Sequence, residues 1–432
     1  MPRKRLFPPV DPHSSQRLQS KGRDEHSILT INGRITLWRR RWSGPGTGSV
    51  TPLDALLDAA EATLTVGVRE LACRLNQASH NFDKAAENLA RAAQVVLSGE
   101  RLRQVVEAEG RAVLQTQQSG ALVLGWTAAD CHVPPPVAAV LAPAAPPPTR
   151  GTSAAAATPA AVATRLYLGS DGVKVPLVTD AEKQARRTKI KQKRRRRGRK
   201  CQPLPKAKLG ADQRYKEFKI VTFYDERQTH RHVSVTQGDH QTAGALMRHD
   251  ACRLRLDLAD DKVAVIDGAP WIRNQIKGQS LPLDVIELDF YHLADNVHKA
   301  RRVVYGEEAP DGQAWAAAVL HTAKHAGYVA LRDQLVAWKG TVRGTKKRKA
   351  AELLLDYVTD RRDMVEYPEY LAAGRQIGSG PTESMCKTTT ARLKGVGMRW
   401  DAGNAEAIMV LDALEQSGEW KRYWELCLQL AV

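Results

Sequence analysis

The chain has 432 residues, and its 65 lysines and arginines against 47 aspartates and glutamates give a formal net charge of +18. This length allows two or three domains with separate cores, and so large a positive charge favours a polyanionic partner, most often nucleic acid. The six cysteines are scattered without a Cys-x-x-Cys pair, which argues against a disulfide framework or a cysteine zinc site and suits a reducing cytoplasm. No apolar run reaches the ~18 residues of a membrane-spanning helix.

A β-hairpin is the first element that the sequence predicts. Residues 27–42 alternate in polarity around Asn32-Gly33, a pair typical of hairpin turns. The second strand ends in three cations beside Trp42, namely Arg39, Arg40 and Arg41. These arginines suit contact with DNA phosphates. They equally suit a solvated edge strand that charge protects from aggregation.

Short helices and a linker follow the hairpin. Helices are expected from Pro52 onward and over residues 66–75, 81–97 and 100–109. Such helices on a basic chain are compatible with a helix-turn-helix reader of DNA, although helical bundles serve many other roles. We therefore predict a basic arm over residues 1–50 and a helical candidate DNA-binding domain over residues 51–132. Residues 133–163 are rich in Pro and Ala and are interpreted as a linker.

The next domain is expected to begin with a strand and a basic run. The strand, over residues 165–178, contains Ser170-Asp171-Gly172, which we expect to interrupt it. An acidic side chain inside an apolar strand costs stability unless it is exposed, paired or bound to a cation. Residues 183–200 form a block of like charge, typical of a disordered segment that grips nucleic acid or of a localisation signal. The block includes Arg194, Arg195, Arg196 and Arg197.

Two buried strands further along the chain each end on an aspartate. After strands at 217–224 and 230–236 and a helix at 242–256, the strand at 263–266 stops at Asp267, and Gly268 to Pro270 turn the chain. A short helix leads to the strand at 283–288, and Asp289 then opens a helix. His292 follows Asp289 by one turn and shares its helix face. Each aspartate alone is more often a turn or cap residue.

The C-terminal part is predicted to be helical. Residues 307–373 are charged and rich in tryptophan, and we interpret them as a helical insertion. Residues 377–383 open a last long helix that ends near residues 395–397, with Pro381 in its first turn. Glu383, Lys387, Thr390 and Lys394 fall on one stripe of this helix. For Glu383 alone, a first-turn carboxylate that the helix dipole favours is the simpler interpretation.

Three carboxylates from distant segments nevertheless form a pattern. The order of elements predicts an α/β fold with a mixed sheet, and in such sheets functional groups gather where strands end. Asp171, Asp267 and Glu383, with no cysteine ligand, suit Mg²⁺ or Mn²⁺. On a basic protein, this set favours two-metal phosphodiester chemistry. Asp225 is a rival for the first carboxylate, but its place in a hairpin turn favours Asp171.

These motifs together resemble a known family. Residues 164–425 are similar to the transposases of bacterial insertion sequences with an Asp-Asp-Glu triad, in particular the Kra-type group, which is akin to the Mutator-like transposases. The resemblance depends on the order and spacing of several segments. They are Ser170-Asp171-Gly172-Val173, Val265-Ile266-Asp267-Gly268-Ala269-Pro270-Trp271, Leu288-Asp289-Phe290-Tyr291-His292, Gly378-Ser379-Gly380-Pro381-Thr382-Glu383-Ser384, Arg392-Leu393-Lys394 and Gly397-Met398-Arg399-Trp400.

The resemblance implies an architecture and a site. It implies an RNase H-like core over residues 164–306 and 374–432, with the helical insertion at 307–373 between the second aspartate and the glutamate. Asp171, Asp267 and Glu383 match the metal-binding triad for Mg²⁺ or Mn²⁺. Asp289 and His292 match a pair that such transposases carry after the second aspartate, near the scissile DNA. Lys387, Lys394 and Arg399, with the basic run at 183–200, are then expected to hold the DNA backbone.

The activity that the resemblance implies is DNA transposition. The expected partners are double-stranded DNA, as terminal inverted repeats and as target, and further copies of the chain in a homodimer or larger assembly. The expected location is the bacterial cytoplasm, at the nucleoid and not at a membrane. One departure is Ser43-Gly44-Pro45-Gly46, which stands where related proteins often carry paired cysteines. Two alternatives remain open, namely a non-catalytic DNA-binding protein (a repressor or a decayed transposase) and a metal-dependent nuclease of the same fold.

Overall fold

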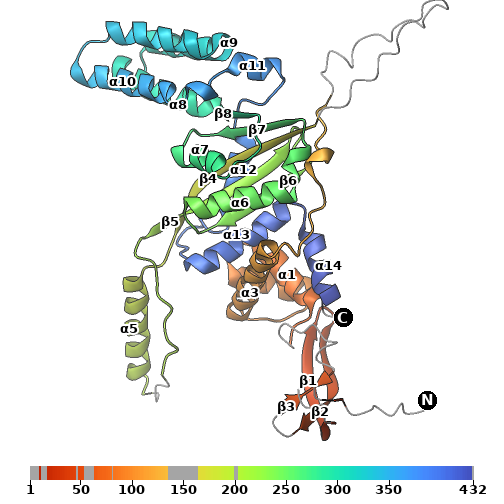
Figure 1. Cartoon of the computed structure of the whole chain (residues 1–432). Coiled ribbons are helices and arrows are strands. Elements are labelled where there is room, and N and C mark those ends of the chain that lie inside the picture. Colours follow the sequence, from red (N-terminus) through yellow and green to blue (C-terminus); the bar gives the residue numbers. More distant parts are fainter. Residues whose placement is uncertain are drawn as a thin grey trace, which may run out of the picture. The chain divides into compact units, whose positions relative to one another are not determined.

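The structure is a computed structural model that describes residues 9–10, 17–44, 47–52, 63–79, 81–134, 164–198 and 203–430 (Figure 1). The chain divides into two compact units. Unit 1 comprises Met1–Val123, Pro176–Arg214 and Ala391–Val432, and unit 2 comprises Leu124–Val175 and Tyr215–Thr390. This division differs from the predicted boundaries, because residues 176–214 and 391–432 belong with the N-terminal segments. The linker over residues 135–163 and most of the helix expected from Pro52 lie outside the described residues.

The N-terminal strands of unit 1 form an antiparallel sheet. β1 (Gln19–Thr30) and β2 (Gly33–Gly44) make the predicted hairpin, which is longer than expected, and β3 (Thr47–Val50) pairs with β2. Thr30 pairs with Gly33, so Ile31 and Asn32 form the turn. Gly33 has a φ of +108°, a backbone conformation that other residues rarely adopt.

Five helices of unit 1 surround a common core. They are α1 (Val66–Gln77), α2 (Phe82–Ala93), α3 (Gly99–Gln118), α13 (Ala402–Gln416) and α14 (Trp420–Leu430). Asn81 caps α2 by accepting the N–H of Lys84 at 2.7 Å, and Ser98 caps α3 in the same way. α3 and α13 pack closely, because a Cβ at Gly110 would overlap the backbone of Ala407.

The basic run of unit 1 is helical over most of its length, so the prediction of disorder is wrong for residues 183–196. It forms α5 (Asp180–Arg196), in which no residue is buried. Thr179 and Glu182 make a capping box at its start. The acidic residues stand in the first turn and the arginines in the last, so the helix dipole favours both sets of charges.

Unit 2 is built on a mixed five-stranded sheet, which confirms the α/β class. Its strands are β4 (Arg165–Pro176), β5 (Tyr215–Asp225), β6 (Arg231–Thr236), β7 (Asp261–Ile266) and β8 (Val285–Leu288), in the order β6-β5-β4-β7-β8. β4, β7 and β8 are parallel, whereas β5 and β6 are antiparallel. Tyr167 contacts Glu226 and Ser170 contacts Ile220, so β4 and β5 also run antiparallel.

Strand β4 is continuous, so the predicted interruption at Ser170-Asp171-Gly172 is wrong. The polar residues are accommodated without a break. Ser170 donates its hydroxyl to the carbonyl of Ile220 at 2.8 Å. Asp171 is only partly buried, which lowers the cost of a carboxylate in a strand.

Helices cover the two faces of the sheet in unit 2 (Figure 1). α6 (His240–Arg253) and α7 (Pro270–Gly278) lie on one face, and α12 (Gly380–Ala391) lies on the other. α12 approaches β4 so closely that a Cβ at Gly169 would overlap the hydroxyl of Thr382. That hydroxyl also lies 3.0 Å from the hydroxyl of Thr222 on β5. These contacts therefore fix the distance between α12 and the sheet.

α12 ends at Ala391, so the prediction that Lys394 lies on this helix is wrong. The last turn contains Thr388, Thr389 and Thr390, whose hydroxyls each bond the carbonyl four residues earlier. Such bonds compete with the backbone and weaken a helix. Trp400 then donates its indole N–H to the carbonyl of Leu393 at 3.1 Å, which holds the chain in a loop.

The predicted insertion is helical and packs against the same core. α9 (Pro310–Thr341), α10 (Thr345–Thr359) and α11 (Tyr367–Ala372) form it, with a kink in α9 at Gly327, and α8 (Phe290–Tyr305), which precedes it, packs against α9 and α10. One cluster of buried apolar side chains runs from the sheet into these helices. Short 3₁₀ helices complete the fold at Ala128–Asp130, Leu256–Leu258 and Arg362–Met364. Among the described residues, no helix combines the length and the apolar character needed to span a membrane.

Candidate active site

Three aspartates lie within or directly after adjacent parallel strands, Asp171 within β4, Asp267 after β7 and Asp289 after β8. Leu168 lies opposite Ala264 between β4 and β7, and Ile266 lies opposite Leu288 between β7 and β8. Asp267 and Asp289 thus follow paired strand ends, and the charge of Asp267 acts on Asp171. Paired residues of parallel neighbours point to the same face of the sheet. This is the face on which α12 lies, since Gly169, two residues before Asp171, contacts Thr382.

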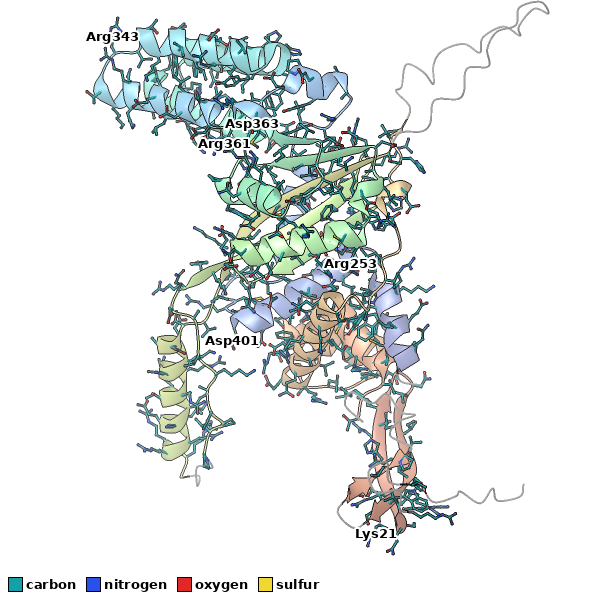
Figure 2. All side chains as sticks on the ribbon, viewed as in Figure 1. Lys21, Arg253, Arg343, Arg361, Asp363 and Asp401 are labelled. Atoms are coloured by element: carbon teal, nitrogen blue, oxygen red, sulfur yellow. The ribbon has the colours of Figure 1, made fainter. Side chains whose placement is uncertain are left out.

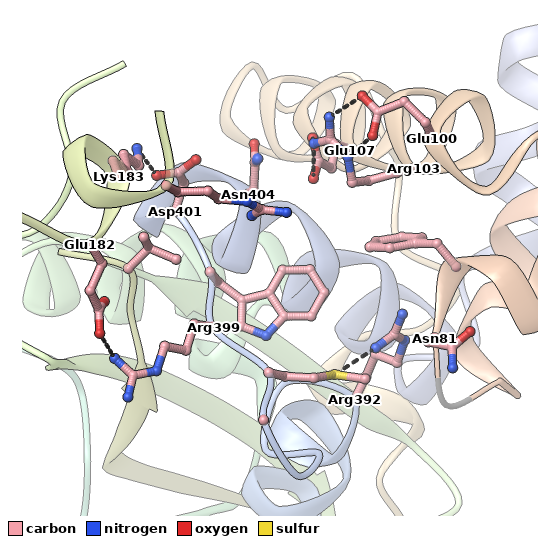
Figure 3. A pocket seen from close by; sticks show the side chains of 16 residues that line it. Asn81, Glu100, Arg103, Glu107, Glu182, Lys183, Arg392, Arg399, Asp401 and Asn404 are labelled. Carbon is pink, nitrogen blue, oxygen red and sulfur yellow. Dashed lines mark hydrogen bonds and ion pairs between the residues drawn. The ribbon is translucent and has the colours of Figure 1, made fainter. Parts of the chain in front are cut away.

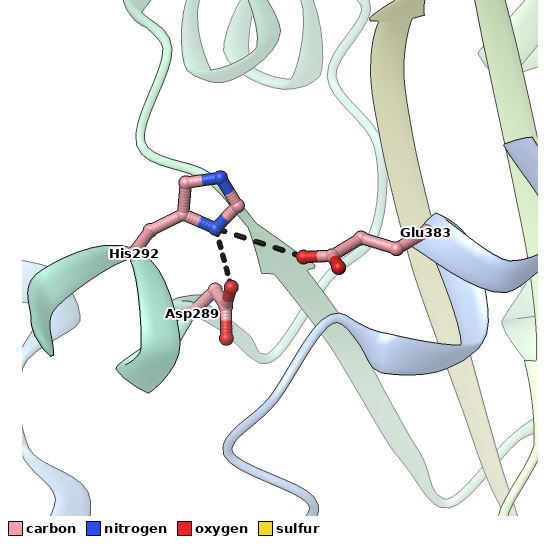
Figure 4. A group of neighbouring side chains, drawn as sticks. All are labelled: Asp289, His292 and Glu383. Atoms are coloured by element: carbon pink, nitrogen blue, oxygen red, sulfur yellow. Dashed lines mark hydrogen bonds and ion pairs between the residues drawn. The ribbon is translucent and has the colours of Figure 1, made fainter. Parts of the chain in front are cut away.

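A carboxylate, an imidazole and a second carboxylate come together at this edge (Figure 4). The side chains of Asp289, His292 and Glu383 each offer a ligand atom, and these atoms lie within 4.8 Å of one another. His292 Nδ1 is hydrogen-bonded to Asp289 Oδ2 and lies 3.9 Å from Glu383 Oε1. Asp289 is fully buried, whereas the side chains of His292 and Glu383 are 39% and 55% exposed. The group thus opens to solvent on the side of His292 and Glu383.

Ser379 connects the two carboxylates of this group and was missed by the sequence analysis. Its hydroxyl lies 2.9 Å from Asp289 Oδ2 and 3.1 Å from Glu383 Oε1. Its backbone N–H also donates to Asp289 Oδ1 at 3.2 Å. A serine just before a helix start is a common cap, and this preference could have singled it out. The residue fixes the start of α12 to the end of β8.

Asp267 takes part in a turn as well as in the site. Its Oδ1 accepts the N–H of Ala269 at 2.8 Å, the local role expected of an aspartate before a turn. Gly268 has a φ of +81°, and a side chain there would overlap Arg361. Arg361 donates to the carbonyl of Gly268 at 2.7 Å, and the hydroxyl of Tyr357 lies 3.5 Å from the carbonyl of Asp267. Tyr357 of α10 and Arg361, two residues after its end, therefore support this turn.

The other two candidate aspartates are placed differently. Asp171 Oδ1 accepts the N–H of Gly172 at 2.6 Å and keeps its second oxygen available. Asp225 is buried and accepts the N–H of His230 at 3.0 Å, closing the hairpin between β5 and β6. Asp225 is thus a turn residue.

The electrostatics tie these groups together. Burial raises the pKa of Asp171, and the negative charges of Asp267 and Glu383 raise it further. Burial also acts to raise the pKa of Asp289, but hydrogen bonds from His292, Tyr291 N–H and Ser379 outweigh it and lower the pKa. The bond to Asp289 raises the pKa of His292, and the charges of Asp267 and Glu383 add to this. The edge concentrates negative charge, which a cation would relieve.

The group that could hold a metal differs from the predicted triad. Within the described residues, Asp289, His292 and Glu383 are the one such group. Asp171 and Asp267 lie outside it, although both act electrostatically on its members. All five predicted catalytic residues therefore gather at one edge of unit 2. The tightest of their contacts is the hydrogen bond between Asp289 and His292.

Two of the candidate DNA-binding residues already have acidic partners. Arg39 forms an ion pair with Asp24 at 3.1 Å, and its side chain is only 11% exposed. Arg399 pairs with Glu182 at the start of α5. Arg40 lies over the ring of Trp42, and Arg41 donates to Ser49. β2 is the middle strand of its sheet and Arg39 is paired and mostly covered, so the interpretation of these arginines as a solvated edge strand is wrong.

The remaining candidate cations are largely accessible. Lys387 is exposed one turn after Glu383 on α12, and Lys394 is exposed in the loop that follows. Arg194 is partly exposed near the end of α5, and Arg195, Arg196 and Arg197 are exposed there. α5 thus carries the largest group of accessible candidate residues.

A cavity of about 710 Å³ lies within unit 1 (Figure 3). Arg392 is buried in its wall, with its guanidinium 4.9 Å from the ring of Phe82 and 5.4 Å from that of Trp400. Most other cations of the wall are paired, as Arg103 with Glu107 at 2.7 Å. Lys183 is paired with Asp401 in the same way. The cavity therefore has little surplus charge with which to attract phosphate.

A comparison of the sequence with models of known protein families gave no match, and a search among curated proteins also gave none.

Proposed function

We propose that the protein is a metal-dependent DNA transposase, which binds the ends of its element, cuts the DNA there and joins the ends to a target. The observation that carries the proposal is the convergence of Asp171, Asp267, Asp289, His292 and Glu383 at one edge of the sheet. The strand order in unit 2, by chain position third-second-first-fourth-fifth, supports assigning an RNase H-like core. The helical insertion between Asp289 and Glu383 is in keeping with this assignment.

The donor set fits a divalent cation. Carboxylate oxygens are the ligands that Mg²⁺ and Mn²⁺ prefer. Asp171, Asp267 and Glu383 would hold the metal, and Asp289 and His292 would stand beside it. When bound, such an ion activates the attacking oxygen and stabilises charge on the phosphate.

The protein's own residues supply positioning and proton transfer. Ser379 and His292 fix the Asp289 carboxylate from two sides. Because Nδ1 of His292 is engaged with Asp289, Nε2 is the ring atom that can hold a proton for the oxygen that leaves the phosphate. Lys387 stands one turn from Glu383, where a cation can contact the DNA backbone.

The basic helix of unit 1 supports DNA as the partner. Nine of the 17 residues of α5 are Lys or Arg, and they occur all around the helix. A helix of this length spans about 25 Å, and its width is comparable to that of the major groove. A helix with no buried face gains little from packing within its own chain. Phosphates on both sides of a groove would offset the repulsion among the Lys and Arg side chains of α5.

A cleavage assay tests the proposal. Plasmid DNA that carries the gene's own flanking sequences is incubated with the full chain and Mg²⁺, Mn²⁺ or EDTA. We expect metal-dependent cuts at the flanks, followed by joining to target DNA. Asp267→Asn should bind the same DNA but reduce cleavage at least about a thousandfold, because an essential oxygen ligand is lost.

The control and the alternatives follow from the same assay. Asp257→Asn changes an aspartate that is paired on the surface with Arg255, and it should cut at the wild-type rate. Cutting without joining would assign a nuclease. Binding without cutting under every metal would overturn the proposal in favour of a DNA-binding protein.

A further inference from the structure

Tyr291 is an exposed aromatic residue inside the candidate active site. It follows the cap residue Asp289 by two positions, and its N–H donates to Asp289 Oδ1 at 3.1 Å. Its relative exposure is 68%, the highest among the large apolar side chains in the described part of unit 2. The next residue along α8 is His292. An exposed ring thus stands beside two groups of the site.

The ring of Tyr291 packs between its own helix, α8, and the turn that leads to α12. A Cβ at Gly378 would lie 3.0 Å from Cε2 of Tyr291 and 3.2 Å from its Cδ2, so the ring rests against the turn that leads to α12. The ring of Phe290 meets it edge-on, with centroids 6.2 Å apart at 80°. Gly378 is therefore a position at which any side chain would crowd the ring.

Neither packing nor hydrogen bonding within the described chain explains the exposed ring. The hydroxyl has no hydrogen-bond partner among the described residues, and most of the side chain faces solvent. A ring left in water forgoes the free energy of burial. Single exposed aromatics are common on protein surfaces, but this one lies where the proposed substrate would have to sit.

We infer that the ring of Tyr291 is a stacking surface for a nucleobase next to the scissile phosphate. The inference rests on the proposed function, since it takes DNA as the substrate of the site. Bases that are unpaired near a cut stack on aromatic side chains regardless of their identity, because every base has a π-face. Tyr291 is then a positioning residue, which sets the strand against Asp289, His292 and Glu383.

Two substitutions distinguish the effect of an aromatic ring at position 291 from the effect of an apolar side chain of another kind. Tyr291→Phe keeps the ring and should cut DNA within about twofold of the wild-type rate. Tyr291→Leu keeps an apolar side chain without a π-face. It should cut roughly ten- to a hundredfold more slowly, as loss of one base stack implies. Thermal melting should be the same for both variants, since the side chain is mostly exposed.

A fluorescent base reports the stacking directly. 2-Aminopurine is placed at each position on either side of the cut, in duplexes that carry the element's end. These duplexes are bound to the non-cutting Asp267→Asn protein. We expect the fluorescence of 2-aminopurine to be quenched at one position of the DNA when residue 291 is Tyr or Phe. At that position the fluorescence should return in the Asp267→Asn, Tyr291→Leu double variant. Equal quenching in the Leu variant, or an unchanged cutting rate, would overturn the inference.

The two proposals fail in different ways. If wild-type protein cuts at the flanks and Tyr291→Leu cuts equally well, stacking is wrong and the transposase proposal stands. If wild-type protein does not cut under any metal, both are overturned.

Discussion

At the scale of single residues, Ser379 is the contact that joins the end of β8 to the start of α12. Asp289 follows β8 and Glu383 belongs to α12, and the serine hydroxyl lies within 3.1 Å of both carboxylates. A hydroxyl that bridges two carboxylates limits how far they can move apart. Both oxygens of Asp289 already accept hydrogen bonds, so Glu383 Oε2 is the carboxylate oxygen of this pair that is left for a cation or a substrate.

Ser379→Ala should therefore weaken the site without unfolding the protein. We expect cleavage to fall about tenfold to a hundredfold, a common effect of removing a residue that orients metal ligands. The Mn²⁺ concentration for half-maximal cleavage should rise, which a purely structural role would not cause. Ser384→Ala, on the exposed side of the same helix, is the matched control. Equal effects of the two changes on metal dependence would contradict this role.

The sequence predicted the members of the site better than their contacts. Asp267 and Asp289 were identified because each ends an apolar run, and both also fill the ordinary turn and cap roles. The approach of Glu383 to His292 depends on the height of α12 on the sheet, which Gly169 and Thr382 set. A close approach of two distant segments leaves no local pattern, so the sequence alone did not show it.

At the scale of elements, a buried contact between His232 and Asp250 fixes α6 to the edge strand β6. His232 Nε2 on β6 lies 3.4 Å from Asp250 Oδ1 on α6, and both side chains are almost fully buried. Burial alone raises the pKa of Asp250, but the interactions with His232, His249 and Ser234 prevail and hold it well below its usual range. The charged carboxylate is thus favoured in the folded protein.

This pair predicts a pH-dependent stability. The pKa of Asp250 is lower in the folded chain than in the unfolded one, so its contribution is present above about pH 4 and is lost as the pH falls below that value. Asp250→Asn should cost about 3 kcal/mol at pH 7, as breaking a buried pair does. The loss should shrink between pH 5 and pH 3, as measured by denaturant unfolding.

A surface aspartate gives the control for this experiment. Asp333→Asn, in an exposed pair with Arg332, should leave stability nearly unchanged at every pH. A pH-independent loss in Asp250→Asn would show that packing, and not the charge of Asp250, stabilises this junction.

The elements that the sequence did not predict well share a cause. α5 was expected to be disordered because of its charge, but the ends of the helix are matched to the charges that they carry. α12 was expected to reach Lys394, but three threonines and the bond from Trp400 end it early. In both cases a few capping or side-chain contacts outweighed the composition of the whole segment.

At the scale of the whole molecule, the excess positive charge is unevenly distributed. α5 carries nine cations and has no buried residue. A second exposed basic cluster lies where α9 turns into α10, with Arg343 at its start (Figure 2) and with Lys346, Lys347 and Lys349 on the helix. α5 carries more positive charge than the second cluster, and the two belong to different units.

Removing the four arginines at the end of α5 and directly after it should change how DNA binding depends on salt. We predict that changing Arg194, Arg195, Arg196 and Arg197 to Gln lowers affinity for duplex DNA and reduces the slope of log affinity against log salt by up to about 3–4. Gln preserves helix propensity. The matched control changes Arg343, Lys346, Lys347 and Lys349 to Gln. An equal loss in both proteins would mean that net charge, and not α5, governs binding.

The discontinuous units impose an order on folding during synthesis. α3 leaves the ribosome early, but its close partner α13 begins only at Ala402. At ordinary translation speeds, roughly ten to forty seconds separate Arg214 from Ala402. Unit 2 has all its residues once Thr390 has emerged, whereas unit 1 still awaits its last segment. The nascent chain can thus assemble its candidate catalytic edge first, and a message truncated before Ala402 would yield a protein whose N-terminal helices never find their partner.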